Sequence, residues 1–155
     1  MLDWIDYLNI NDNYIGNETN KNCIKFIFLW IRYNNYYNKK YTKEINKKYK
    51  EERIRAKALN CDKVQRKYSE FKEEFLNSFK SLSNQDTLKE YITNLKTKEI
   101  ILFNEHNSDL DDFLDTVYQI RCNLFHGDKL ARDYDAKIVS WAYECLNKLL
   151  NDTIF

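Results

Sequence analysis

The chain has 155 residues and a formal net charge of +1, with no proline and two glycines. This length suits one domain whose core buries about 70% of the unfolded surface, and the scarcity of helix breakers together with the lack of β-branched runs of period two predicts an all-α fold. The composition argues against membrane and zinc proteins, because the longest apolar stretch, CIKFIFLWI, is too short to span a bilayer and the four scattered cysteines lack metal-ligand spacing.

The first third of the chain predicts two helices. Residues 3–10 are expected to form a short amphipathic helix, followed by a loop rich in Asn, Asp and Gly. A long helix capped by Asn20 or Asn22 then extends to about Tyr41. Its apolar face, at helical spacing, is made of Ile24, Ile27, Phe28 and Ile31.

Three further helices are expected in the middle of the chain. Thr42 is expected to cap a basic helix from about Lys43 to Leu59, and after the tripeptide NCD another helix extends to about Phe79. A shorter helix over Asp86–Lys96 follows. The helix that ends near Phe79 carries an apolar stripe made of Val64, Tyr68, Phe71, Phe75 and Phe79.

The last two helices have the clearest boundary signals. Ser108 is expected to be the N-cap of a helix over Asp109–Phe125, with Asp111 three residues on in capping-box fashion and Gly127 as the C-cap. The final helix, over Asp133–Leu150, has an apolar face made of Ile138, Trp141, Ala142, Cys145, Leu146 and Leu149. These stripes predict one all-helical domain over the whole chain, a four- to five-helix up-down bundle.

Charge is unevenly distributed along the chain. From Lys39 to Lys67 there are twelve Lys or Arg against four Asp or Glu, a balance of +8, whereas Asn104–Asp128 has one Arg against six acids, a balance of −5. A basic segment can attract polyanions. It can equally be a solvated helical face with Glu–Lys pairs at i,i+4.

Arg121 lies in the middle of an apolar helical face, where a guanidinium costs several kcal/mol of desolvation unless it is paired or reaches water. The face is made of Leu110, Phe113, Leu114, Val117, Ile120 and Leu124. Arg121 could pair with a buried acid, extend its head group to the surface, or line a functional cleft. His126 lies about 140° further round an ideal helix, so the two converge only if the helix end distorts or two copies of the chain meet.

Two segments resemble HEPN domains (higher eukaryotes and prokaryotes nucleotide-binding). The stretch RCNLFHG, from Arg121 to Gly127, resembles their Arg-x4-His signature. The stretch Trp30-Ile31-Arg32-Tyr33-Asn34 is similar to the W-I-x-F/Y-N element on an early helix of some subfamilies. The helical layout is also similar, with the signature on the penultimate long helix.

The resemblance implies a metal-independent endoribonuclease without a cofactor, acting as a homodimer. A cytoplasmic protein is expected from the scattered cysteines, read as reduced thiols, and from a start, MLDWIDYLNI, that does not look like a leader. Arg121 would bind the scissile phosphate, and His126 would move protons to or from the ribose 2′-OH and the leaving 5′ oxygen. Asn123 would orient the histidine or the phosphate, and Asn34 would face the same cleft. The further RNA-binding candidates are Lys39, Lys40 and Lys129, and the tyrosines of RYNNYYNKKY could stack nucleobases.

Such enzymes occur as toxins and abortive-infection effectors, so an antitoxin or regulatory partner is expected. Two positions depart from the pattern. Cys122 stands where a polar residue is common, and Asp128 replaces the tyrosine of toxins that are silenced by nucleotide transfer. The alternatives are a non-catalytic HEPN module that binds RNA, nucleotide or a partner protein, and a structural dimerisation domain.

Overall fold

The computed structural model describes residues 18–45, 61–82, 93, 97–100, 103–125 and 133–155. These residues form four α-helices: α2 (Glu18–Ile45), α4 (Asp62–Lys80), α6 (Leu110–Phe125) and α7 (Asp133–Leu150). Besides the helices, the described residues contain two isolated β-bridges, Thr93–Ile100 and Asn104–Asn107. The predicted all-α bundle is confirmed. The expected helix over residues 3–10 lies outside the described residues.

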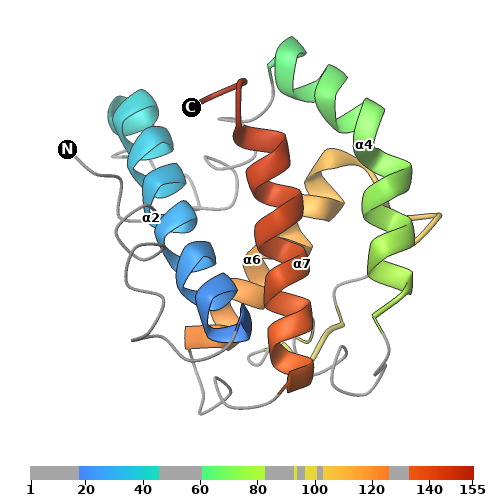
Figure 1. Cartoon of the computed structure of the whole chain (residues 1–155). Helices are drawn as coiled ribbons and strands as arrows, with labels where there is room; N and C mark the ends of the chain where they lie inside the picture. The colour runs from blue at the N-terminus through green and yellow to red at the C-terminus, as the bar shows by residue number, and fades with distance from the viewer. Residues whose placement is uncertain (1–17, 46–60, 83–92, 94–96, 101–102, 126–132) are drawn as a thin grey trace.

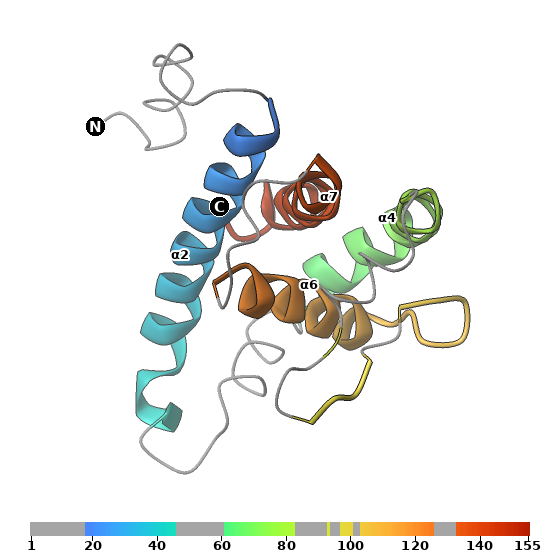
Figure 2. The same ribbon diagram turned by 90° about the horizontal axis from the view of Figure 1, so that it is seen from below.

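Helix α7 is the centre of the bundle. It packs against α2, α4 and α6, and Figure 1 shows it between α2 and α4, with α6 crossing behind. Figure 2, seen from below, places α2 and α4 on opposite sides of α7. In Figure 1 both α2 and α7 run upwards and α4 runs downwards. None of the described helices is long and apolar enough to cross a membrane.

The core is built from one face of each helix. All six apolar residues predicted for α7 and all six predicted for α6 are buried, as are four of the five predicted for α4, where Phe71 is half-buried. Aromatic rings fill the space between α4, α6 and α7, with Phe113 and Phe75 stacked at 5.2 Å between centroids. Trp141 lies 4.7 Å from Phe79 and 5.9 Å from Phe103, centroid to centroid.

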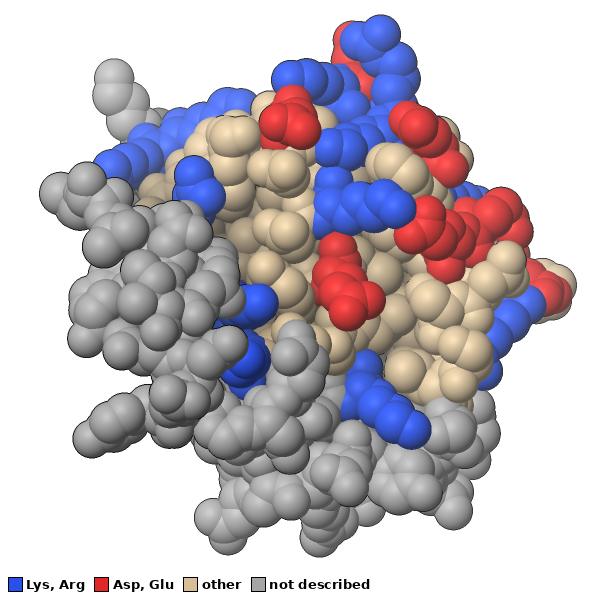
Figure 3. Space-filling view, in the orientation of Figure 1, with Lys and Arg blue, Asp and Glu red and all other residues tan. Residues whose placement is uncertain are grey.

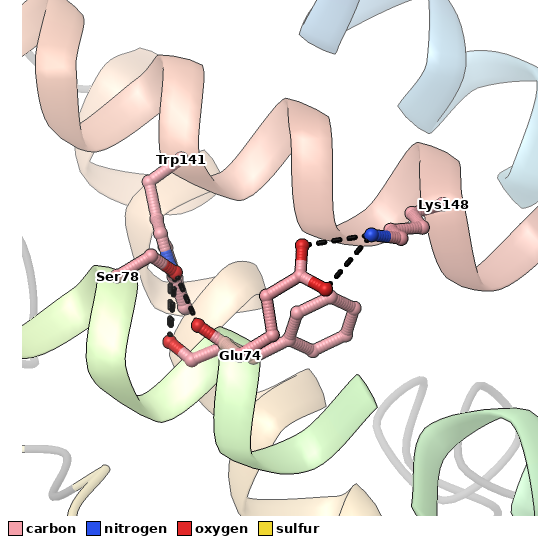
Figure 4. A network of polar contacts seen from close by, with 5 residues as sticks. Glu74, Ser78, Trp141 and Lys148 are labelled. Atoms are coloured by element: carbon pink, nitrogen blue, oxygen red, sulfur yellow. Dashed lines mark hydrogen bonds and ion pairs between the residues drawn. The ribbon is translucent and has the colours of Figure 1, made fainter. Parts of the chain in front are cut away.

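Trp141 also makes polar contacts inside this core. Its indole N–H donates to the carbonyl of Phe75 at 3.3 Å and to the Ser78 hydroxyl at 3.1 Å. Figure 4 shows this contact beside a second link between the same two helices, in which the Lys148 ammonium donates to both carboxylate oxygens of Glu74, at 2.7 and 2.9 Å. Helices α4 and α7 are therefore fixed in register by one buried and one exposed pair of contacts.

The predicted apolar face of α2 is not the one that is fully buried: Ile24, Ile27 and Phe28 are half-buried. Ile31 is 48% exposed. The buried face is instead made of Cys23, Phe26, Leu29, Trp30, Tyr33 and Tyr37. Residues 23–33 are apolar on nearly all sides of the helix, so periodicity alone does not select a face, and the side with the larger aromatic surfaces packs inward.

The predicted cap at Thr42 is also wrong, because α2 continues through this residue to Ile45. The expected basic helix after it lies mostly outside the described residues. Between Gly16 and Gly127 the chain has neither glycine nor proline, so nothing in the local sequence stops the helix at Tyr41.

Helix α6 begins one residue later than predicted. Asp109, rather than Ser108, is the cap: its carboxylate accepts from the N–H of Asp112 at 2.8 Å, and the Asp112 carboxylate accepts from the N–H of Asp109 at 3.0 Å. This is a reciprocal capping box. Ser108 is buried, and its carbonyl accepts from the Tyr68 hydroxyl at 2.9 Å, which fixes it outside the helix.

Asp109→Ala is expected to lower the free energy of unfolding by about 1 kcal/mol, because the first turn of α6 loses its cap. Urea denaturation measures this change. Asp111→Ala is the matched control, because it removes an exposed carboxylate from the same turn and should change stability by less than about 0.5 kcal/mol. Equal losses in both variants would contradict the assignment of Asp109 as the cap.

Tyr68 makes the fold sensitive to alkaline pH. Burial, followed by the nearby charges of Asp109 and Asp112, raises the pKa of the Tyr68 phenol above its ordinary value of 10.0. The phenol therefore contributes stability that is complete below about pH 10 and is lost as the pH rises through its folded pKa, because only the unfolded chain ionises readily. We expect Tyr68→Phe to flatten the fall in unfolding free energy that sets in as the pH rises above about 10. Parallel pH profiles for the two proteins would contradict this.

Candidate functional site

Arg121 lies in the last turn of α6 and is half-buried. Its guanidinium carbon is 6.0 Å from the ring centroid of Trp30 on α2 and 6.0 Å from that of Tyr118, one turn earlier on α6. One guanidinium nitrogen contacts the Cys122 sulfur at 3.9 Å. The cation therefore lies between α6 and α2, with aromatic surface from both helices.

The aromatic surface beside Arg121 is closely packed. Trp30 is 2% exposed, and its ring lies 5.9 Å from Tyr118 and 5.6 Å from Tyr33, edge-on to the latter. A cation over an aromatic face gains about 0.5–1 kcal/mol at exposed sites and about 2 kcal/mol when desolvated. These contacts offset part of the desolvation that a guanidinium pays on an apolar helix face.

Asn123 occupies a buried amide network. Its side-chain N–H₂ donates to the carbonyl of Thr93 at 3.1 Å, and its side-chain oxygen accepts from Gln119 at 2.8 Å. Gln119 also donates to the Thr93 carbonyl, at 3.3 Å. The two amides thus attach Thr93 to the last turns of α6, where Gln119 and Asn123 lie two residues before and after Arg121.

Gln119 and Thr93 were not predicted to take part. Two amides at i,i+4 on one helix are a weak sign of such a pair, but their acceptor comes from a distant segment. Thr93 was expected within a helix over Asp86–Lys96. It is instead paired with Ile100 in an isolated β-bridge, which suits a β-branched residue whose carbonyl is used by side chains.

Among the other predicted residues, His126 and Lys129 lie outside the described part of the chain, as does Gly127. Helix α6 ends at Phe125, so His126 follows it directly in sequence. The Asn34 side chain accepts from Asn38 on the next turn of α2, at 3.1 Å. The structure thus places Trp30 of the W-I-x-Y-N segment against Arg121 of the RCNLFHG segment. The contact of Asn34 with Asn38, in contrast, lies within α2.

The side chains of the aromatic stretch RYNNYYNKKY differ in how far they are buried. Tyr33 and Tyr37 are 0% and 1% exposed and belong to the core, in edge contact with each other at 5.2 Å. They are not accessible to nucleobases. Tyr36 is half-buried, and the exposed Lys40 donates to its hydroxyl at 2.9 Å. Lys39 is also exposed.

Among the residues that the structure describes, neither His106 nor the cysteines form a separate site. His106 is exposed in a turn where its N–H donates to the Asn104 side chain at 2.9 Å. Cys23 and Cys145 are buried, and Cys61 and Cys122 are half-buried. Within the described residues there is no group of three or more His, Cys, Asp or Glu that could hold a metal ion.

Comparison of the chain with protein-family models, with curated proteins and with solved structures found no match. Its function therefore has to be inferred from its own residues and their arrangement.

Proposed function

We propose that this chain is a HEPN-type endoribonuclease that cleaves RNA without a metal ion. The observation that supports this most directly is the contact between the two motif segments. Arg121 on α6 lies against Trp30 on α2, although the two are far apart in sequence. A cation held by aromatic rings at the end of a helix, and only half-buried, suits recognition of a phosphate.

In the proposed reaction the ribose 2′-OH attacks the adjacent phosphorus, and the bond to the 5′ oxygen of the next nucleotide breaks. The products are a 2′,3′-cyclic phosphate and a 5′-OH. Arg121 stabilises the negative charge that develops on the phosphoryl oxygens. His126 accepts the proton of the 2′-OH or donates one to the leaving oxygen. Asn123 acts as a positioning residue, because its amide holds the last turn of α6 against Thr93.

A homodimer is part of the proposal. Arg121 and His126 diverge by about 140° on an ideal helix, so a composite site between two copies gives each phosphate both groups. The biological setting that fits is a cytoplasmic toxin or phage-defence effector, restrained by an antitoxin or regulatory partner.

A non-catalytic HEPN module that binds RNA, nucleotide or a partner protein is the second candidate. It is favoured because polar side chains of the RCNLFHG motif make contacts with other residues of the same chain. The Asn123 side chain is hydrogen-bonded to Gln119 and to the Thr93 carbonyl. The guanidinium of Arg121 contacts the sulfur of Cys122, a position at which HEPN motifs commonly have a polar residue. Such a module would bind RNA in the same way after His126→Ala.

The deciding experiment is incubation of a labelled structured RNA with the purified protein in EDTA. We expect cuts that end in a 2′,3′-cyclic phosphate, identified by their sensitivity to acid and to a phosphatase that opens the cycle. Intact RNA, with binding retained, would favour the non-catalytic module. Cleavage that requires added magnesium would contradict the proposed mechanism.

A further inference from the structure

One end of the bundle gathers basic side chains from two helices. We call the basic end the set Arg32, Lys39, Lys40, Lys63, Arg66 and Lys67. Figure 1 shows the second half of α2, the start of α4 and the end of α7 together at the top of the molecule, and Figure 3 shows Lys and Arg along that edge. In residues 32–40, 62–67 and 148–155 the acidic side chains are Asp62 and Asp152, so basic groups, with Lys148 included, outnumber acidic ones seven to two.

The turn after α7 joins the two halves of the basic end. The Lys67 ammonium on α4 donates to the carbonyl of Asn151 in this turn. Three residues on, the N–H groups of Ile154 and Phe155 donate to the carbonyl of Leu150, which folds the segment back over the helix end. Phe155 is thereby carried to the surface of α2.

On α2 the basic end has a regular order. Arg32, Tyr36 and Lys40 are four residues apart, so they lie along one side of the helix at steps of about 6 Å. The Arg32 guanidinium lies 4.1 Å from the centroid of the Phe155 ring, and that ring meets Tyr36 edge-on at 6.4 Å. The Lys40 ammonium lies 5.4 Å from the centroid of the Tyr36 ring. Two rings thus hold two exposed cations in fixed places.

We propose that the basic end binds the phosphodiester backbone of a single-stranded RNA segment, as an anchor separate from the Arg121 site. A guanidinium packs on a ring through its face, whereas its planar N–H edge is the part that makes two parallel bonds to a phosphate. The ammonium of Lys40, two helical turns on, takes a further phosphate as a point charge. Half-exposed Tyr36 between them offers an aromatic surface to a base, as in single-strand binders.

The proposal rests on RNA being the substrate, and it adds how the strand is held outside the reacting phosphate. It also gives a role to the uneven charge of the sequence, in which Lys39–Lys67 is basic and Asn104–Asp128 is acidic. The acidic side chains at the start of α6 repel the strand, whereas the basic end, fixed by the turn after α7, attracts it.

The test is fluorescence anisotropy with a short, labelled 2′-O-methyl RNA, which binds but cannot be cleaved through its 2′ oxygen. The double variant Arg32→Gln/Lys40→Gln is compared with Lys25→Gln/Lys137→Gln, which removes two cations from the first halves of α2 and α7. We expect the first variant to bind more weakly, with a salt slope of log K less negative by about 1.4, since two phosphate contacts are lost. The control variant should keep the wild-type slope.

Equal slopes in the two double variants, or no binding by the wild type, would overturn the proposal. So would tighter binding to vesicles of equal parts phosphatidylserine and phosphatidylcholine with the same dependence on Arg32 and Lys40, since the partner would then be a membrane surface. The result is separable from catalysis. A wild type that binds as expected but cleaves nothing supports the anchor and contradicts the nuclease, whereas cleavage with unchanged slopes does the reverse.

Discussion

Replacing Arg121 by alanine is expected to slow metal-independent RNA cleavage by roughly 10²–10³-fold. The guanidinium is the one cation that α6 contributes beyond its acidic first turn, and removing a single group that stabilises developing charge costs about this much in other enzymes. Because the charge develops in the transition state, the loss should appear in kcat more than in KM. Single-turnover cleavage of the labelled RNA in EDTA measures the effect.

Three further variants make this result specific. His126→Ala should reduce cleavage by roughly 10²–10⁴-fold as a lost acid or base, whereas His106→Ala, in an exposed turn, should leave it unchanged. Arg121→Leu should lose activity while keeping or raising the free energy of unfolding, because leucine suits the apolar face on which Arg121 lies. A large loss of stability in Arg121→Leu would instead assign the guanidinium a structural role.

Replacing Trp141 by alanine is expected to lower the free energy of unfolding by about 3–5 kcal/mol. The indole is 4% exposed and contacts the rings of Phe79, Phe103 and Phe113, so alanine leaves a cavity where three helix surfaces meet. The midpoint and slope of urea denaturation, followed by far-UV circular dichroism, give the change in free energy.

Trp141→Phe separates the packing from the polar part of this effect. It keeps a ring in the core but removes the donor to Ser78 and to the Phe75 carbonyl, and we expect a loss of about 1–3 kcal/mol. Ile31→Ala, at a side chain that is 48% exposed, should cost far less than Trp141→Ala. If Trp141→Ala cost no more than Ile31→Ala, the central place of this tryptophan would be contradicted.

Where one side of a helix was polar, the sequence was enough to predict its buried face. Helix α7 has Lys137, Glu144 and Lys148 opposite its apolar stripe. Its bounds and six of its eight buried apolar residues were predicted correctly. Helix α2 has no such contrast between Cys23 and Tyr33. Its orientation follows from which rings fit against α7 and Tyr118, which is a property of the assembled core.

The candidate site was predictable only in part for a related reason. The position of Arg121 on an apolar face could be read from the spacing within α6. Its aromatic neighbour on α2 could not, because a contact between helices depends on their crossing. Asn123 was expected to orient the histidine or the phosphate. Its amide also donates to the carbonyl of Thr93, and no local pattern links these two residues.

The place of α7 in the bundle has a consequence for how the protein is made. Synthesis proceeds from the N-terminus, so α2, α4 and α6 leave the ribosome before the helix against which all three pack. Until Leu150 has been added, Arg121 and Trp30 have no completed core to hold them together. A chain interrupted anywhere before this helix therefore lacks the surface against which α2, α4 and α6 pack, and its core stays incomplete.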